Sequence, residues 1–258
     1  MQGEQRVQDG EQRVQDDQYA FPYHYVPRWE GGFSQAVVLR WGYEYAAYTS
    51  HLLERLARLE FDSLLDVGCG DGRLVSEAQR RFGRARSFLG VDYSERAIQL
   101  AQAMNPAGSF VCANVVEDDL PGRPFDVVTL IETLEHIPPA DVAAFVEGLR
   151  KQTRDGAVLL VSVPSHNIPV QKKHYQHFDL ASLTAALSPH FRVRDHAFIN
   201  RRSPWVKLLE RGMANGLYAL RERHLLSLGY RAYLRYGLHA DASNAKRLVA
   251  ECVASPGG

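Results

Sequence analysis

The stretch Leu64-Leu65-Asp66-Val67-Gly68-Cys69-Gly70-Asp71-Gly72 closes an apolar run and leads into a helical pattern over residues 73–81. Glycines on three alternate positions let the backbone turn tightly and leave no side chain between it and a ligand. A nicotinamide fingerprint, G-x-G-x-x-G, needs a further glycine at the place that Arg73 occupies. The stretch therefore predicts a strand-to-helix turn that binds a nucleotide and excludes the dinucleotide pattern.

The form D-x-G-x-G-x-G resembles the glycine loop of class I S-adenosylmethionine-dependent methyltransferases. The next apolar stretch, residues 88–92, supports the resemblance because it ends in an acid, Asp92. The resemblance implies S-adenosylmethionine as cofactor. The three glycines would then approach its methionine and ribose portions, Asp66 its amino group, and Asp92 its ribose hydroxyls.

Further cofactor contacts follow from the same resemblance. The family usually has an aspartate near Asn114 that accepts a hydrogen bond from the adenine amino group, and the Asn114 side chain can accept that bond instead. The implied cofactor residues are Asp66, Gly68, Cys69, Gly70, Gly72, Asp92, Tyr93, Asn114, Val115 and Ile131.

Composition indicates a soluble protein with a sizeable core. The chain has 258 residues, of which 45% are hydrophobic, enough for one large domain or a domain with a cap. Three widely spaced cysteines favour neither a disulfide framework nor a CxxC metal knuckle. No apolar run approaches the roughly 20 residues that span a bilayer, and the polar N-terminus lacks a signal-peptide core. We expect a cytoplasmic protein without a membrane partner.

Charge is balanced overall and uneven along the chain. Thirty basic side chains match thirty acidic ones, but residues 171–247 carry fourteen Lys and Arg against five Asp and Glu. Such an excess favours an anionic substrate or a nucleic-acid surface, and the solvated faces of amphipathic helices would also account for it.

The N-terminal part divides in two. Residues 3–9 are repeated at 10–16 with one apolar residue in each seven, so residues 1–18 are predicted to be disordered. Residues 19–60 form an aromatic-rich cap, helical from about Ser34 to Leu59. Its aromatic side chains would either contact a substrate or seal an edge of the sheet.

The remaining pattern predicts an α/β fold, a doubly wound, seven-stranded, Rossmann-like methyltransferase sheet. The core spans residues 61–199, a helical insertion or lid spans 200–246, and residues 247–258 hold the last strand and the C-terminus. Helices are expected after Gly72 and from N-caps at Ser94, Asp141 and Asp179. The expected strands are Ser63–Val67, Ser87–Asp92, Ser109–Ala113, Phe125–Ile131, Ala157–Val163, Phe191–Ile199 and Arg247–Ala254.

A second motif, E-x-x-E-H, follows the strand that ends at Ile131. Glu132, Glu135 and His136 stand at i, i+3 and i+4, so they would share one face if the segment coils directly after the strand. Two carboxylates and an imidazole there make a candidate divalent-metal site. A further ligand would come from the loop after the fifth core strand, where His174 is favoured over His177.

This arrangement is similar to two groups, the metal-dependent small-RNA 3′-terminal ribose 2′-O-methyltransferases and the ubiquinone-biosynthesis O-methyltransferases. The resemblance implies that Glu132, Glu135, His136 and His174 or His177 bind Mg²⁺ or another divalent ion, with Glu132, His136 and His174 as the catalytic set. Mixed nitrogen and oxygen ligation leaves Mn²⁺, Fe²⁺, Co²⁺ and Zn²⁺ open. Without a metal, His136 or a loop histidine would be the general base.

Several acceptors fit these features. A small-molecule O-methyltransferase ranks first, with a phenolic, catecholic, sugar or anionic acceptor. RNA 3′-terminal ribose is an alternative that the basic tail and its tyrosines permit, although neutral overall charge disfavours it. N-methylation of a small molecule and a non-catalytic cofactor-binding subunit are further alternatives.

Overall fold

The computed structural model describes residues 28–29, 33–34, 39–83, 85–213, 215, 217–218, 220 and 222–256. The tail predicted to be disordered, residues 1–18, lies outside the described residues, as does most of the cap before residue 39. Two short strands, β1 (Arg28–Trp29) and β2 (Phe33–Ser34), pair antiparallel ahead of the first described helix.

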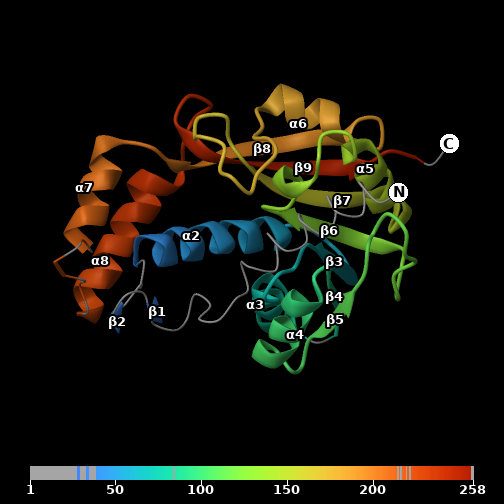
Figure 1. The fold of residues 1–258 in the computed structure, drawn as a ribbon, viewed down its shortest axis with the longest axis horizontal. Helices are drawn as coiled ribbons and strands as arrows, with labels where there is room; N and C mark the ends of the chain where they lie inside the picture. The colour runs from blue at the N-terminus through green and yellow to red at the C-terminus, as the bar shows by residue number, and fades with distance from the viewer. Residues whose placement is uncertain are drawn as a thin grey trace.

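A seven-stranded sheet forms the centre of the molecule, with helices on both faces (Figure 1). Strands β3 to β7 pair in parallel, whereas β9 runs antiparallel to both of its neighbours, which confirms the predicted doubly wound sheet with a terminal hairpin. In sheet order the strands are β5 (Ser109–Cys112), β4 (Ser87–Asp92), β3 (Ser63–Val67), β6 (Phe125–Ile131), β7 (Thr153–Pro164), β9 (Ala245–Ala254) and β8 (Phe191–Arg201).

The sheet separates two hydrophobic layers, because successive side chains of a strand point to opposite faces. Leu64 and Leu65 of β3 are both fully buried, and each belongs to a different layer. Leu64 packs in the layer that includes Leu56, and Leu65 packs in the layer that includes Phe145. Burial on both faces explains why the central strands read as nearly continuous apolar runs.

Local signals set the helix boundaries of the core. The predicted cap at Ser94 is confirmed, since its hydroxyl accepts a hydrogen bond from the Ala97 amide at 3.3 Å. Asp179 and Ser182 form a reciprocal capping box. One helix begins after Asp141 as predicted, although that side chain makes no capping bond. The core helices are α3 (Arg73–Phe82), α4 (Glu95–Met104), α5 (Val142–Lys151) and α6 (Leu180–Leu187).

The N-terminal helix α2 (Leu39–Leu56) joins the sheet to the insertion, as Figure 1 shows. Its buried side chains Tyr48, Leu52 and Leu56 pack into the layer that covers β3 and β9. Arg55 near its end lies 2.9 Å from the Asp195 carboxylate of β8. The described part of the cap is therefore a structural layer of the fold, and its first turns reach the insertion.

The insertion before β9 is helical, as predicted. It contains α7 (Pro204–Met213), α8 (Arg223–Tyr233) and a π-helical turn, η3 (Leu234–Leu238). Tyr233 is fully buried, and its hydroxyl accepts a hydrogen bond from the Asn200 side chain at 2.8 Å. Across the residues described, no helix has both the length and the apolar character needed to cross a bilayer.

Two helical glycines, Gly148 of α5 and Gly212 of α7, test how tightly each helix packs against its surroundings. A Cβ at Gly148 would lie 2.7 Å from the Val115 carbonyl oxygen, whereas a Cβ at Gly212 meets nothing within 4 Å. We expect Gly148→Ala to lower the free energy of unfolding by about 1–3 kcal/mol, because backbone atoms must shift. The control Gly212→Ala should raise it by up to about 1 kcal/mol, because alanine is the better helix former. Urea denaturation measures both, and equal effects would contradict the crowding at Gly148.

Candidate active site

The glycine loop between β3 and α3 has the backbone geometry that the sequence predicted. Gly68, Gly70 and Gly72 have φ angles of 70°, 53° and 71°, in the left-handed region that favours glycine. A Cβ at Gly68 would lie 2.3 Å from the Thr133 hydroxyl oxygen, and one at Gly72 would lie 2.6 Å from the Phe110 ring. A side chain at Gly68 or Gly72 would therefore force Thr133 or Phe110 to shift.

Two acids lie on either side of this loop. Asp92, at the end of β4, accepts hydrogen bonds from the Gly70 amide at 3.1 Å and the Ser94 amide at 2.9 Å. Asp66 is buried in β3 and accepts a hydrogen bond from the Thr129 hydroxyl at 2.7 Å. Burial raises the pKa of Asp66 to about 7, with the nearby Asp92 and Asp71 charges adding to the effect.

The other predicted cofactor residues lie around the same edge of the sheet. Cys69 and Val115 are buried, Ile131 ends β6, and Tyr93 is 45% exposed. Asn114 is exposed, but its side-chain oxygen already accepts a hydrogen bond from the Val116 amide at 3.1 Å. An adenine amino group would have to share that oxygen, so the structure gives Asn114 a local turn-forming role that the sequence did not reveal.

Glu132 follows β6 in an unusual conformation. Its φ is 52°, which is uncommon for a residue other than glycine. Its carboxylate accepts hydrogen bonds from the Ser162 hydroxyl at 2.8 Å and from the Arg247 Nε at 3.0 Å. The expected single helical face does not form, because a 3₁₀ turn, η2 (Leu134–His136), begins only two residues later.

Sequence reasoning missed the partner of Glu132, which is the guanidinium of Arg247. Arg247 also donates to Glu44 of α2 at 2.7 Å and to the Asn200 side-chain oxygen at 3.2 Å, and it stacks on the Tyr48 ring. Burial opposes ionisation of Glu44, but the charges of Arg247 and Lys246 outweigh it and hold its pKa below the usual range. The only signal in the sequence was a Lys-Arg pair at the start of the last strand.

Glu135, His136 and His174 come together beside Glu132. One potential ligand atom from each lies within 4.8 Å of the other two. Glu135 is 1% exposed, and its Oε2 has no hydrogen-bond partner among the described residues. Burial raises the pKa of Glu135 well above its usual value, and the charge of Glu132 raises it further. This carboxyl group is therefore most stable as an ion when a cation lies against it.

Both imidazoles of this cluster are neutral at physiological pH. Burial lowers the pKa of His136 to about 4 and that of His174 to about 3, with the Lys173 charge contributing to both shifts. His136 Nδ1 lies 2.9 Å from the Lys173 carbonyl oxygen, and the Tyr175 amide donates to the Glu135 carbonyl oxygen at 2.9 Å. These bonds fix the loop after β7 against η2.

The structure thus brings together three of the five predicted metal ligands. Glu132 lies outside the group and is bound by Arg247, and His177 contacts His174 instead. His174, which the sequence analysis favoured over His177, is the histidine of this loop that joins Glu135 and His136.

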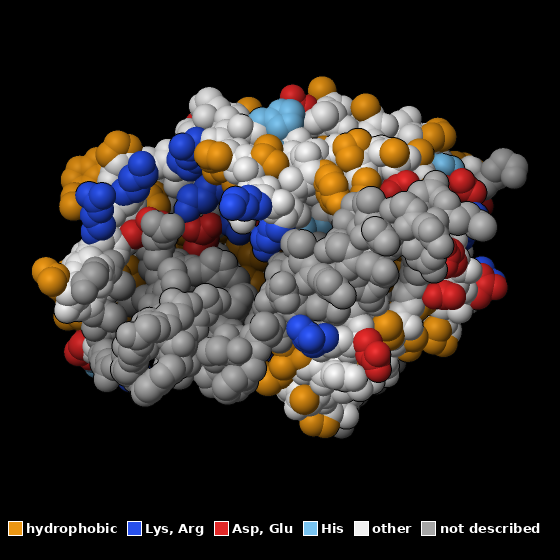
Figure 2. Space-filling view, in the orientation of Figure 1, with side chains coloured by type: hydrophobic (Ala, Val, Ile, Leu, Met, Phe, Trp, Pro, Cys, Tyr) orange, Lys and Arg blue, Asp and Glu red, His pale blue; other side chains and the backbone are white. Residues whose placement is uncertain are grey.

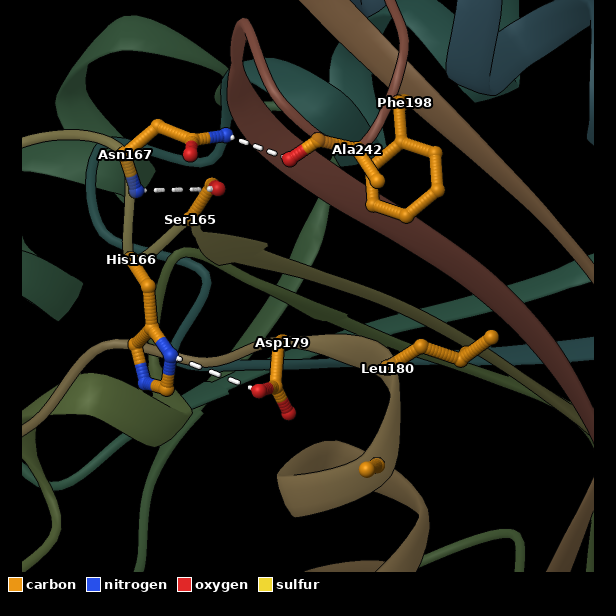
Figure 3. A pocket seen from close by; sticks show the side chains of 8 residues that line it. Ser165, His166, Asn167, Asp179, Leu180, Phe198 and Ala242 are labelled. Carbon is orange, nitrogen blue, oxygen red and sulfur yellow. Dashed lines mark hydrogen bonds and ion pairs between the residues drawn. The ribbon is translucent and has the colours of Figure 1, made fainter.

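A pocket of about 510 Å³ lies between the start of the loop that joins β7 to α6, which we call the histidine loop, and the first residues of α6 (Figure 3). Ser165, His166, Asp179 and Phe198 are among its lining residues, and His166 lies 3.6 Å from the Asp179 carboxylate. Glu135, His136 and His174 are not among the residues that line this pocket. It is therefore separate from the candidate active site.

Exposed Lys and Arg side chains gather over the insertion and the ends of β8 and β9 on the face shown in Figure 2. Arg201, Arg202, Lys207 and Arg211 are all exposed. Part of the basic excess seen in the sequence is therefore on the surface, at the end of β8 and in α7.

The parallel sheet, the left-handed glycine loop and the acid that ends β4 define a class I S-adenosylmethionine-dependent methyltransferase. A family model described as a methyltransferase domain matches residues 41–210, and the chain belongs to that family. Its cofactor is S-adenosylmethionine.

Curated relatives cover part of the chain. A probable S-adenosylmethionine-dependent methyltransferase from Mycolicibacterium smegmatis is 30% identical over 154 residues, which are 55% of this chain and 57% of that protein. A ubiquinone biosynthesis O-methyltransferase from Pseudomonas paraeruginosa is 30% identical over 121 residues, 45% of this chain and 50% of that protein. The chain spans about half the length of these relatives.

Solved structures share the fold. The N-methyltransferase NodS from Bradyrhizobium japonicum WM9, in complex with S-adenosyl-L-homocysteine, superposes with a TM-score of 0.56 at 12% identity, covering 83% of this chain and 88% of that chain. A SAM-dependent methyltransferase from Archaeoglobus fulgidus has a TM-score of 0.54 at 15% identity, covering 83% of this chain and 98% of that one. At these identities the likeness concerns the fold alone.

The crowding at Gly68 predicts a loss of cofactor binding on substitution. Gly68→Ala should weaken binding of S-adenosylhomocysteine by about tenfold or more, or about 1.4 kcal/mol, because the loop must move away from Thr133. Gly83→Ala is the matched control, since Gly83 has a φ of 83° but meets nothing within 4 Å. It should bind with unchanged affinity in calorimetric titration. Normal binding by Gly68→Ala would show that the loop does not need this glycine.

The raised pKa of Asp66 predicts a pH effect on stability. A carboxyl group whose pKa is about 7 when folded, against 3.8 as its ordinary value, stabilises the fold below about pH 4 and loses that contribution as the pH rises through 7. Asp66→Asn removes the titrating group. The free energy of unfolding should therefore fall more steeply between pH 4.5 and 7.5 in the wild type than in the variant. Parallel pH profiles would contradict the burial of an ionisable Asp66.

Proposed function

We propose that this protein transfers the methyl group of S-adenosylmethionine to a hydroxyl of a small-molecule acceptor, with a divalent metal ion held by Glu135, His136 and His174. The observation that carries the proposal is the convergence of these three side chains within 4.8 Å at the edge of the sheet where the glycine loop lies. Ligands of open α/β sheets bind at this edge, beyond the carboxyl ends of the parallel strands.

The donor set fits a divalent cation. The cluster has three lone-pair donors: the buried Oε2 of Glu135, which has no hydrogen-bond partner among the described residues, and two neutral imidazoles. These donors repel one another unless a cation lies between them. Two nitrogens and one carboxylate suit Mn²⁺, Fe²⁺, Co²⁺ or Zn²⁺, and a harder ion such as Mg²⁺ would rely more on Glu135. His136 keeps Nε2 as its acceptor, because Nδ1 donates to the Lys173 carbonyl.

Methyl transfer requires the protein to position the two reactants and to provide a base that takes one proton. The acceptor oxygen attacks the methyl carbon in line, the carbon–sulfur bond breaks, S-adenosylhomocysteine leaves, and the hydroxyl proton passes to a base. A bound divalent ion would supply charge that lowers the pKa of the acceptor hydroxyl. Arg247 and Ser162 fix the Glu132 carboxylate at the end of β6, where it can orient the hydroxyl or take its proton.

Two observations support the acceptor class. The curated relatives include ubiquinone biosynthesis O-methyltransferases, which favours oxygen over nitrogen as the atom methylated. The exposed Arg201, Arg202 and Lys207, at the end of β8 and in the insertion, favour an acceptor with a negative charge. A phenol or catechol with an acidic group is therefore the first acceptor to test.

The metal part of the proposal is tested by Glu135→Gln. Manganese should bind the EDTA-treated wild-type protein in calorimetric titration and bind the variant about 10- to 100-fold more weakly, because a charged ligand is lost. Binding of S-adenosylhomocysteine should be similar in both. His196→Gln, an exposed histidine on β8, is the control for adventitious binding and should bind manganese like the wild type.

Enzyme assays test the metal dependence and the O-methylation separately. Methyl transfer from labelled S-adenosylmethionine to a catechol carboxylic acid should need the added metal and should fall with Glu135→Gln. Metal-independent transfer to the hydroxyl would remove the metal and make His136 the leading candidate for general base. Transfer to amines but not hydroxyls would overturn O-methylation.

A further inference from the structure

The loop between β7 and α6 contains a chain of hydrogen bonds that ends at the candidate metal cluster. His177 Nδ1 lies 3.1 Å from the Ile168 carbonyl oxygen, and His177 Nε2 lies 2.8 Å from His174 Nδ1. His177 is 4% exposed, and its own carbonyl oxygen contacts the His166 Nε2. His177 is therefore held at both nitrogens and through its backbone.

When each imidazole carries one proton, only one assignment of donors and acceptors satisfies both hydrogen bonds of His177. A carbonyl oxygen only accepts, so His177 Nδ1 must carry the proton that it donates to Ile168. His177 Nε2 then has a lone pair, and His174 Nδ1 must donate to it. The proton on His174 thus lies on the nitrogen that faces His177, and Nε2 is the nitrogen left with a lone pair.

We propose that His177 is a positioning residue: it fixes the tautomer of His174 and so keeps His174 Nε2 available as an acceptor in the cluster with Glu135 and His136. His177 is then not itself a ligand, which agrees with the preference for His174 over His177 in the sequence analysis. A histidine ligand whose second nitrogen donates to a fixed acceptor has a set ring orientation and higher basicity, and losing that acceptor weakens metal binding by about 10- to 100-fold.

The matching bond at His136 supports this assignment. His136 Nδ1 also donates to a fixed acceptor, the Lys173 carbonyl oxygen, at 2.9 Å. The two neighbouring imidazoles, whose ring centroids are 4.8 Å apart, therefore have the same tautomer from two different partners. One partner is a backbone carbonyl, which no substitution removes, and the other is the His177 side chain, which substitution can test.

Two substitutions at position 177 separate the acceptor from the shape of the ring. His177→Phe keeps a flat ring in the buried site but has no acceptor, whereas His177→Gln places an amide oxygen near the position of Nε2. Circular dichroism and binding of S-adenosylhomocysteine establish that each variant folds. His196→Gln again serves as the control for removal of an exposed histidine.

The first measurement is the tautomer of His174 in the metal-free protein, observed by two-bond proton–nitrogen NMR of ¹⁵N-histidine-labelled samples at pH 7. We expect the Nδ1–H form in the wild type, in His177→Gln and in His196→Gln, and a shift toward the Nε2–H form in His177→Phe. An Nε2–H form in the wild type, or an unchanged Nδ1–H form in His177→Phe, would overturn the inference.

The second measurement is manganese affinity, and it rests on the metal site proposed above. His177→Phe should bind about 10- to 100-fold more weakly than the wild type, with His177→Gln restoring most of the loss. Equal weakening in both variants would mean that His177 is itself a ligand or only fills space, and would overturn the positioning role. If the wild type binds no manganese, the metal proposal fails, and the tautomer measurement still decides the role of His177.

Discussion

The half-buried guanidinium of Arg247 is the constraint on which the edge of the sheet beside Glu132 depends. It bonds to Glu132 after β6, Glu44 of α2 and Asn200 of β8, so one side chain ties three separate elements together. Among the described residues, Glu132 and Asn200 are also the two non-glycine residues with a left-handed backbone. Removing Arg247 would leave the Glu132 carboxylate and the buried Glu44 carboxylate with less compensating charge. The network thus holds Glu132 and Asn200 in a strained backbone conformation.

Arg247 reaches this edge because one strand of the sheet is reversed. β9 runs antiparallel to β7, and Arg247 pairs with Pro164 at the carboxyl end of that parallel strand. A residue at the start of β9 therefore lies beside residues that follow the ends of β6 and β7. The terminal hairpin completes the sheet and also supplies cationic side chains to an edge that otherwise gathers carboxylates.

The sequence predicted the glycine loop and the strands beside it well because their causes are local. The glycine loop, the acid that ends β4 and the Ser94 cap each act within a few residues, and the predicted bounds of β3, β4 and β6 match the structure. The arrangement of Glu132, Glu135 and His174 depends on contacts between distant segments. No local pattern showed that Arg247 would engage Glu132, or that His177 would contact His174. Both outcomes follow from how β9 and the histidine loop pack.

The contacts of the glycine loop and those of Arg247 also differ in sequence separation. Asp92 and Gly70 are 22 residues apart, whereas Arg247 is 115 residues from Glu132 and 203 from Glu44. Loop-closure entropy must be paid before a contact between distant segments can form, so such contacts form slowly during folding. The glycine loop and the acid that ends β4 should therefore assemble early in folding, and the contacts that Arg247 makes with α2 and β6 should form later.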